Sequence, residues 1–445
     1  MGIGRLALLL MLLIGPLAAC SCSDEMESSK NLTQSTQYKI ISDNKYELLE
    51  FVYTMLIANA VDEEGQKQGE MLYAQVEKYA NSIKTKNGLG NVDIAFRKIA
   101  YLYNSIDQYG KPIELSAMIF WLGYFQNEEW YDLAPEDIYL MEHYTISSNS
   151  EAPTVGFPLE PLVSGNKLII MPDYIGYGST KGMIHPYLNH ELCAVNSIDA
   201  LPSGYALFDA LSEKSMSEGW RSVVMGASQG GGNALAIHKY MDTHASLAKQ
   251  WNFAYSSCCA GPYSPAMTVD IYLESGKTIY PVVFPLTLKS MLDSYPSLFN
   301  GYSEEDFFSA NYLNHKSKID EMIGSKNYTS TEINNYFFEN VRITSSEGLA
   351  DNEILLKDIL SEAMLDQNSQ LVKQLYKALD KSDLTEGWRP KHPIKLYYSK
   401  GDKVVPYQNS IAVQEAFGYD MVTVTPFSDD MSHHEVCAAW MVAMK

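Results

Sequence analysis

The fold of this chain is indicated most strongly by Val223-Val224-Met225-Gly226-Ala227-Ser228-Gln229-Gly230-Gly231-Gly232. Strand-type apolar residues run straight into Gly-x-Ser-x-Gly, and a helix-compatible segment follows, which is the layout of a nucleophile elbow. At such a turn the serine, here Ser228, lies on a strained backbone that presents its hydroxyl above the sheet. Gly226 and Gly230 are needed because a Cβ at either position would collide with the neighbouring backbone. The backbone N–H of Gln229 opens the helix and is placed to donate to an oxyanion.

A nucleophilic serine needs a base and a group that orients this base, and after such an elbow they follow in the order Asp or Glu, then His. The strand-like run Ile394–Tyr398 leads into a loop that contains Asp402. A last strand-like run and a polar loop lead to Ser432-His433-His434-Glu435, whose outer residues have capping-box spacing for a final helix. We predict Asp402 as the acid and His433 as the base, with His434 as the alternative because spacing does not choose between them.

The second oxyanion donor is expected from the loop after an earlier strand. Ile138–Glu142 is a strand candidate, and His143-Tyr144-Thr145 follows it. We predict that the backbone N–H of Tyr144 or Thr145 acts together with that of Gln229, and that His143 is structural. These groups would support acyl transfer, in which the histidine takes the serine proton, returns it to the leaving alcohol, and water then cleaves the acyl-enzyme.

The N-terminus carries export signals. A basic start and the apolar run Leu6–Leu17 end in Ala18-Ala19-Cys20, which looks like a bacterial lipobox. We therefore expect residues 1–19 to be a lipoprotein signal peptide and residues 20–37 to be a polar tether held to the membrane by acyl chains on Cys20. The predicted location is the bacterial cell envelope, at the outer membrane, facing the periplasm or the surface.

Composition excludes several classes of protein. The 445 residues are 46% hydrophobic and 12% aromatic, which is enough for one large domain with insertions. The net charge of −21 opposes binding to nucleic acid or to anionic membrane surfaces. No zinc-type cysteine pair and no phosphate-binding or dinucleotide glycine loop is found in the sequence, so no metal and no cofactor are expected. The sequence does not indicate an oligomeric state.

Of six cysteines, Cys20 is assigned to lipid and Cys22 to the tether. The four others, Cys193, Cys258, Cys259 and Cys437, allow three disulfide pairings, between which the sequence does not choose. The adjacent pair at 258 and 259 is interpreted as buried apolar residues rather than a strained bridge.

The order of predicted elements indicates a mostly parallel, doubly wound α/β sheet. Strands are expected near 96–106, 113–122, 138–143, 167–172, 221–226, 251–257, 393–399 and 420–426, the first two as an antiparallel edge. Residues 38–264, with a helix over 44–61 and a polar helix or loop over 63–83, would form the first part of the core, and residues 388–445 the second part.

Residues 265–387 separate the serine from the acid by far more chain than one strand–helix–strand passage needs. We predict a helical cap there that covers Ser228, with helices over 285–292, 302–312, 330–340 and 353–379. Its aromatic run Tyr336-Phe337-Phe338 either lines an acyl pocket or packs inside the cap.

Several segments resemble the secretory lipase-like branch of the α/β-hydrolases, which includes fungal lipase A. The matching segments are Pro172-Asp173-Tyr174-Ile175-Gly176-Tyr177-Gly178, His185-Pro186-Tyr187-Leu188, Gly226–Gly231, Trp388-Arg389-Pro390 and Asp402–Ser410, within residues 96–444. The resemblance implies an α/β-hydrolase fold, hydrolysis of carboxylic esters, a helical cap and no cofactor. The chain departs from this pattern at Gly232-Asn233, where a histidine is usual, which affects packing more than chemistry.

The predicted function is therefore a serine hydrolase that cleaves carboxylic esters, of a lipid or of a small molecule, in the manner of an esterase or lipase. Two alternatives stay open. A serine exopeptidase of the same fold would need an acidic pair in the cap to bind an amine. A non-catalytic binding lipoprotein is disfavoured by the intact order of serine, aspartate and histidine.

Overall fold

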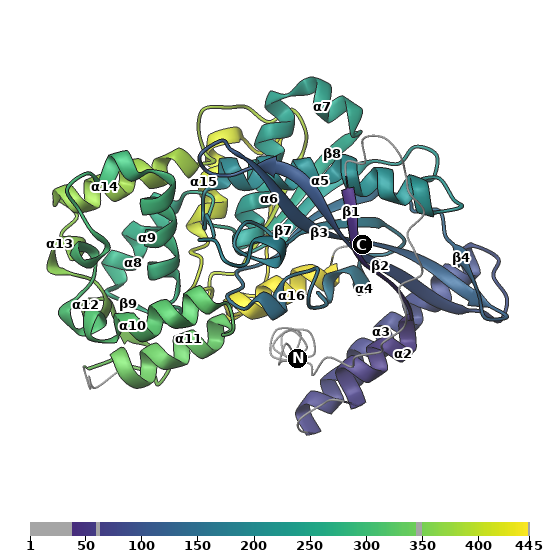
Figure 1. Cartoon of the computed structure of the whole chain (residues 1–445), viewed down its shortest axis with the longest axis horizontal. Helices are drawn as coiled ribbons and strands as arrows, with labels where there is room; N and C mark the ends of the chain where they lie inside the picture. The colour runs from purple at the N-terminus through teal and green to yellow at the C-terminus, as the bar shows by residue number, and fades with distance from the viewer. Residues whose placement is uncertain (1–37, 59–62, 344–348, 444–445) are drawn as a thin grey trace.

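A mixed, mostly parallel β-sheet runs through the protein (Figure 1). The computed structural model describes residues 38–58, 63–343 and 349–443. The predicted signal peptide, Cys20 and the tether lie outside this range. Among the described residues, no helix combines the length and the apolarity that crossing a bilayer requires.

The main sheet has the strand order β1-β2-β3-β6-β5-β7-β8-β11-β12, with β4 paired to β3. Neighbours from β6 to β12 are parallel, whereas β1, β2, β3, β4 and the β3–β6 pair are antiparallel. The strands are β1 (Tyr38–Glu47), β2 (Asp93–Ile106), β3 (Pro112–Gln126), β4 (Glu129–Asp132), β5 (Ile138–Glu142), β6 (Leu168–Pro172), β7 (Ser222–Ala227), β8 (Phe253–Cys259), β11 (Ile394–Tyr398) and β12 (Val422–Pro426).

Helices cover both faces of this sheet, and alternate side chains of each central strand enter opposite cores. In β3, Ile119 and Trp121 pack with helices α5 and α6, whereas Met118 and Phe120 pack with α2, α3 and α16. The core helices are α2 (Leu48–Tyr53), α3 (Glu63–Lys86), α4 (Glu160–Val163), α5 (His190–Leu211), α6 (Gln229–Thr243), α7 (Ala245–Gln250), α15 (Gln408–Phe417) and α16 (His433–Ala443). This is the predicted α/β architecture, and the predicted strands are present as β2, β3, β5, β6, β7, β8, β11 and β12.

The chain between β8 and β11 forms a separate lobe, drawn in green in Figure 1, with a hydrophobic core of its own. Its helices are α8 (Pro265–Ser275), α9 (Val283–Ser294), α10 (Ala310–Ser325), α11 (Ser330–Tyr336), α12 (Leu356–Ile359), α13 (Glu362–Leu365) and α14 (Gln370–Leu379), and β9 (Lys277–Thr278) pairs with β10 (Ile354–Leu355). The helices predicted over 285–292 and 330–340 are present, the latter ending in a π-helical turn, Phe337–Val341.

Three predicted helices are wrong in extent. The helix predicted from residue 44 begins only at Leu48, because residues 44–47 pair with β2 as the end of β1. The helix predicted over 302–312 is a 3₁₀ turn, Glu304–Phe307, and the real helix α10 starts at Ala310.

The single helix predicted over 353–379 is β10, α12, α13 and α14 in succession. Ser361 and Ser369 each accept a hydrogen bond from a backbone N–H and so start a new helix. Local capping and the β9–β10 pairing therefore override the helical periodicity of this segment.

The elbow between β7 and α6 is closely packed against neighbouring backbone. A Cβ added to Gly226 would lie 2.3 Å from the carbonyl oxygen of Gly230, and a Cβ on Gly230 would lie 2.1 Å from that of Glu142. Both are backbone obstacles, which cannot rotate away as a side chain can.

Gly230→Ala should therefore lower the free energy of unfolding by about 2–4 kcal/mol or prevent folding. Gly324→Ala is the matched control, since a Cβ there meets nothing within 4 Å and the residue lies in helix α10. The free energy of unfolding of Gly324→Ala should be unchanged or higher by up to ~1 kcal/mol, because alanine has the higher helix propensity. Thermal and urea unfolding measure both changes, and equal stability of the two variants would show that the elbow has room to adjust.

Candidate active site

Ser228 is the turn residue between β7 and α6, with φ 57° and ψ −126°. A non-glycine residue at positive φ is strained, and such strain persists only where the surroundings enforce it. Here the backbone N–H of Ser228 donates to the carbonyl oxygen of Cys259 at 2.9 Å, which fixes the turn to the end of β8. The hydroxyl is thereby presented at the carboxyl edge of the parallel strands.

His433, the first residue of α16, contacts both of its predicted partners. Its Nε2 lies 2.8 Å from Ser228 Oγ, and its Nδ1 lies 2.7 Å from Asp402 Oδ2. An ionised carboxylate only accepts, so Nδ1–H donates to Asp402 and the neutral ring keeps Nε2 free to accept from the serine hydroxyl. All three side chains are buried, with 6–8% exposure. Residues far apart in the sequence thus form one Ser–His–Asp chain of hydrogen bonds.

Asp402 is held in place by main-chain donors that the sequence analysis did not identify. Its Oδ1 accepts from the N–H groups of Val404 at 2.8 Å and Val405 at 2.9 Å. This arrangement leaves Oδ2 for the imidazole. An aspartate that bonds the amides two and three residues later, ahead of Pro406, is a turn signal that could have been recognised in the sequence.

His434, the alternative base, does not take part in this chain. Its ring stands 5.9 Å from the His433 ring and 6.4 Å from the Tyr280 ring, measured between centroids. Burial and the neighbouring His433 lower the pKa of His434 to about 4.

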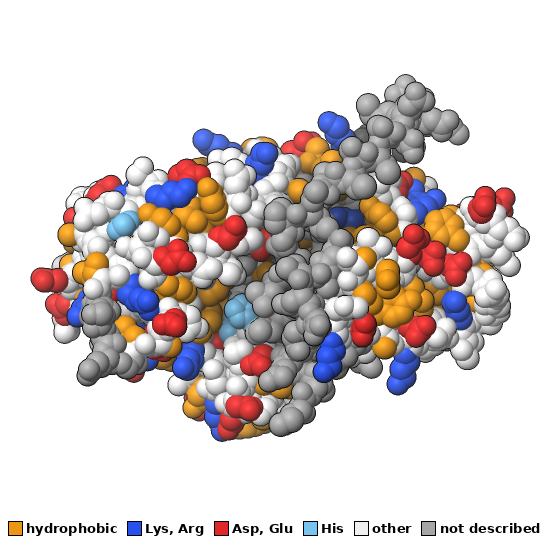
Figure 2. Space-filling model, turned by 90° about the horizontal axis from the view of Figure 1, so that it is seen from below, with side chains coloured by type: hydrophobic (Ala, Val, Ile, Leu, Met, Phe, Trp, Pro, Cys, Tyr) orange, Lys and Arg blue, Asp and Glu red, His pale blue; other side chains and the backbone are white. Residues whose placement is uncertain are grey.

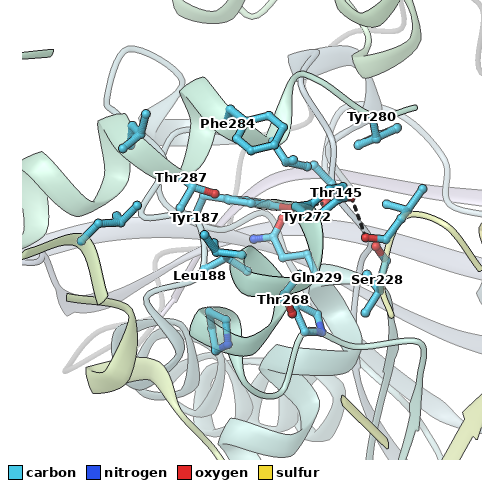
Figure 3. Close-up of a pocket in the computed structure, with 18 of the residues that line it drawn as sticks. Thr145, Tyr187, Leu188, Ser228, Gln229, Thr268, Tyr272, Tyr280, Phe284 and Thr287 are labelled. Atoms are coloured by element: carbon cyan, nitrogen blue, oxygen red, sulfur yellow. Dashed lines mark hydrogen bonds between the residues drawn. The ribbon is translucent and has the colours of Figure 1, made fainter. Parts of the chain in front are cut away.

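Two of the predicted oxyanion donors stand at the same cavity as the serine. Gln229 is the first residue of α6, and both Gln229 and Thr145 line the cavity together with Ser228 (Figure 3). Tyr144, the other candidate, is not among the lining residues of this cavity. His143 stacks on Tyr174 with 3.9 Å between centroids, and its ring nitrogens lie within hydrogen-bond distance of the backbone oxygens of Tyr144 and Asp173.

The cavity next to Ser228 measures about 780 Å³, including the part open to solvent, and is mainly apolar. It lies between the core and the cap, and Figure 3 shows Tyr272 and Phe284 of the cap facing Tyr187 and Leu188 of the core. None of its lining side chains is charged. The lining residues are Thr145, Tyr187, Leu188, Ser228, Gln229, Pro262, Pro265, Thr268, Val269, Tyr272, Tyr280, Val283, Phe284, Thr287, Leu288, Leu360, Met364, Leu375, Val404 and Val405.

The aromatic run 336–338 does not line this cavity. Phe337 is fully buried in the hydrophobic core of the cap, which is the second of the two interpretations of this segment. The cavity is lined instead by α8 and α9, by single residues of α6, α13 and α14, and by loops.

Other polar side chains near the site are structural. Asp173 is fully buried and accepts hydrogen bonds from Ser116 Oγ at 2.5 Å and from the N–H of Thr154 at 2.9 Å.

The four described cysteines, Cys193, Cys258, Cys259 and Cys437, are free and buried. In the part of the chain that the structure describes, no group of three His, Cys, Asp or Glu side chains is arranged to hold a metal ion.

The comparisons with known proteins agree with this fold. No profile of a known family and no curated protein matches the sequence. Among solved structures, a ligand-bound form of the rice cell wall degrading esterase LipA from Xanthomonas oryzae shares 18% identity at a TM-score of 0.66, over 92% of this chain and 97% of that chain. A Legionella pneumophila protein provisionally assigned as a hydrolase shares 15% identity at 0.64, over 92% and 95%.

Candida antarctica lipase A in its closed state is more distant, with 12% identity over 78% of this chain and 74% of that chain, at a TM-score of only 0.47. The esterase match shows that the chain has an α/β-hydrolase fold. At such low identities the function has to be argued from the site itself.

The charge state of His433 sets the expected pH dependence of kcat/KM. Burial lowers its pKa, but Asp402 and Cys437 raise it more, to about 9. Because only neutral imidazole accepts the serine proton, kcat/KM should rise with pH through the neutral range. His433→Ala should lose about 10⁴-fold in kcat. Its kcat/KM should also no longer rise with pH through the neutral range.

His434→Ala is the matched control and should keep both the rate, within about threefold, and the shape of the profile. Initial rates between pH 5 and 10 measure both variants. The opposite pattern, with His434 essential and His433 dispensable, would show that the base is assigned to the wrong histidine.

Proposed function

We propose that this protein is a serine hydrolase of carboxylic esters that works through an acyl-enzyme. The observation that carries the proposal is the hydrogen-bonded chain from Ser228 Oγ through His433 to Asp402. In this mechanism His433 removes the proton from Ser228 as its oxygen attacks the ester carbonyl. Asp402 holds the ring in the correct tautomer and stabilises the imidazolium that forms.

The next steps use the same groups. His433 gives its proton to the leaving alcohol, then removes a proton from water, which attacks the acyl-enzyme. The N–H groups of Gln229 and Thr145 are proposed to hold the oxyanion of both tetrahedral intermediates, because both residues stand beside the nucleophile.

The cavity favours esters with an apolar acyl group over peptides. An exopeptidase needs charged groups to bind the terminal amine or carboxylate of its substrate, and the lining of this cavity contains neither acidic nor basic side chains. A buried apolar wall next to the nucleophile instead stabilises a hydrocarbon chain, by about 0.8 kcal/mol for each buried CH₂. The similarity in fold to an esterase also supports an ester substrate over a peptide substrate.

Turnover of p-nitrophenyl esters of graded acyl length, compared with peptide p-nitroanilides, tests this function. The wild type should hydrolyse esters, and Ser228→Ala should lose at least ~10³-fold in kcat. Ser325→Ala, at an exposed position in the cap, is the matched control and should be unchanged. Turnover of anilides alone would indicate the exopeptidase, and the absence of any turnover that depends on Ser228 would indicate the binding lipoprotein.

We also propose that the protein is anchored in the bacterial envelope by acyl chains on Cys20. The support is the apolar leader that ends in Ala18-Ala19-Cys20 and the polar segment that follows. The triad would then act near a membrane surface, at the end of a tether.

Cys20→Ser should abolish incorporation of labelled palmitate and move the protein out of the membrane fraction, because the thioether would be missing. Cys22→Ser, two residues away, should behave like the wild type. Fractionation and labelling of intact cells measure both variants, and an unchanged Cys20→Ser variant would rule out the anchor.

A further inference from the structure

A buried acid, Glu142, lies directly beneath the nucleophile elbow. It is the last residue of β5, is 2% exposed, and pairs in the sheet with Gly226. Its carbonyl oxygen is the obstacle that a Cβ on Gly230 would meet at 2.1 Å. The main chain of Glu142 therefore touches the elbow and continues directly into the loop 143–145, which contains Thr145. None of the catalytic steps above uses its side chain.

The side chain of Glu142 enters a buried polar cluster between the sheet and helices α5 and α6. Its Oε2 accepts from Ser197 Oγ at 2.9 Å, whereas Oε1 has no hydrogen-bond partner among the described residues. Asn233 of α6 is fully buried, and its side-chain oxygen and nitrogen likewise have no hydrogen bond of good geometry within the described chain. Tyr174 completes the contacts, since its hydroxyl interacts with both Glu142 and Asn233.

Among the described residues, no positively charged group acts on Glu142 to compensate a negative charge. The titratable groups that face Glu142 are Tyr103 of β2, Tyr174 after β6 and Cys193 of α5, and burial raises the pKa of each of them. For Glu142 itself, burial raises the pKa to about 8, against smaller opposing effects of the nearby Ser197 and Tyr174 hydroxyls. The carboxyl group is therefore protonated at neutral pH and can donate a hydrogen bond from Oε1.

This cluster is connected to the loop by one further contact. The Tyr174 hydroxyl donates to the carbonyl oxygen of His143 at 3.1 Å, and the His143 ring stacks on the Tyr174 ring. A protonated Glu142 donates toward Tyr174 and leaves the tyrosine proton on the His143 carbonyl. An ionised Glu142 only accepts, so it competes for that same tyrosine proton and releases the loop.

We propose that Glu142 is a positioning residue that, as a neutral acid, holds the loop 143–145 and its oxyanion donor in register with Ser228. The inference rests on the proposed ester hydrolysis. Ionisation of Glu142 should weaken stabilisation of the oxyanion, which forms only along the reaction path, so kcat should fall while KM changes little. The ester rate should therefore stop rising with pH above about 8, although His433 continues to lose its proton.

Three variants of the full chain test this role. Glu142→Gln keeps a neutral donor, Glu142→Ala removes it, and Asp199→Asn is the control for a partly buried acid on α5 that bonds Ser105 instead of the loop. At pH 7, Glu142→Gln should keep kcat within about threefold, and Glu142→Ala should lose about 10²-fold in kcat with KM within threefold. Circular dichroism and thermal unfolding show whether each variant is folded.

The decisive quantity is the ratio of kcat for Glu142→Gln to kcat for the wild type as a function of pH. It should rise at least about fivefold between pH 7 and 9.5, since only the wild type ionises there, while the ratio for Asp199→Asn stays flat. A flat ratio for a folded Glu142→Gln, or a loss as large as that of Glu142→Ala, overturns the positioning role alone. A wild type without turnover that depends on Ser228 overturns the proposed function and this inference together.

Discussion

The site depends on one backbone constraint, the positive φ of Ser228 between β7 and α6. A serine in that conformation is strained, and the strain is held by close backbone packing that excludes any side chain from Gly226 and Gly230. The turn places the start of α6 next to the serine oxygen, so one local geometry supplies both the proposed nucleophile and the first amide of the proposed oxyanion site. The histidine and the aspartate can then reach it only from loops at the same edge of the sheet.

Those loops are fixed by different parts of the chain. The proposed acid, Asp402, follows β11 and is held by the amides of Val404 and Val405, and the proposed base, His433, opens α16 after β12. Because β7, β8, β11 and β12 are consecutive parallel neighbours, their carboxyl ends lie along one edge. The cap is inserted between β8 and β11, so it emerges at that edge and closes the apolar cavity over the serine. The face of the molecule in Figure 2 carries acidic and basic side chains interspersed with hydrophobic ones.

Sequence patterns predicted the parts of this structure that depend on local chemistry. The Gly-x-Ser-x-Gly motif between a strand and a helix identified the elbow, and chain order identified Asp402 and the pair His433 and His434, between which only the hydrogen bonds of the structure distinguish. The sequence patterns gave the wrong secondary structure where tertiary contacts determine the backbone conformation. Residues 44–47 have no strand signal of their own and become extended because β2 offers them a partner. Segment 353–379 is broken by serine caps and by pairing with β9, which periodicity does not reveal.

The choice between Tyr144 and Thr145, and the role of Glu142, likewise required the arrangement in space. A glutamate at the end of an apolar strand gives no sign in the sequence that it will be enclosed by α5, α6 and Tyr174. Its burial only becomes apparent once the sheet and its helices are assembled.

The central claim is that Ser228 is a nucleophile activated by His433, and covalent labelling tests it most directly. A fluorophosphonate reacts only with an activated serine, and peptide mass spectrometry locates the modification. We expect stoichiometric modification of Ser228 in the wild type and labelling at least ~10³-fold slower in a folded His433→Ala variant. An unlabelled protein, or modification of another serine at the same rate in both, would contradict it.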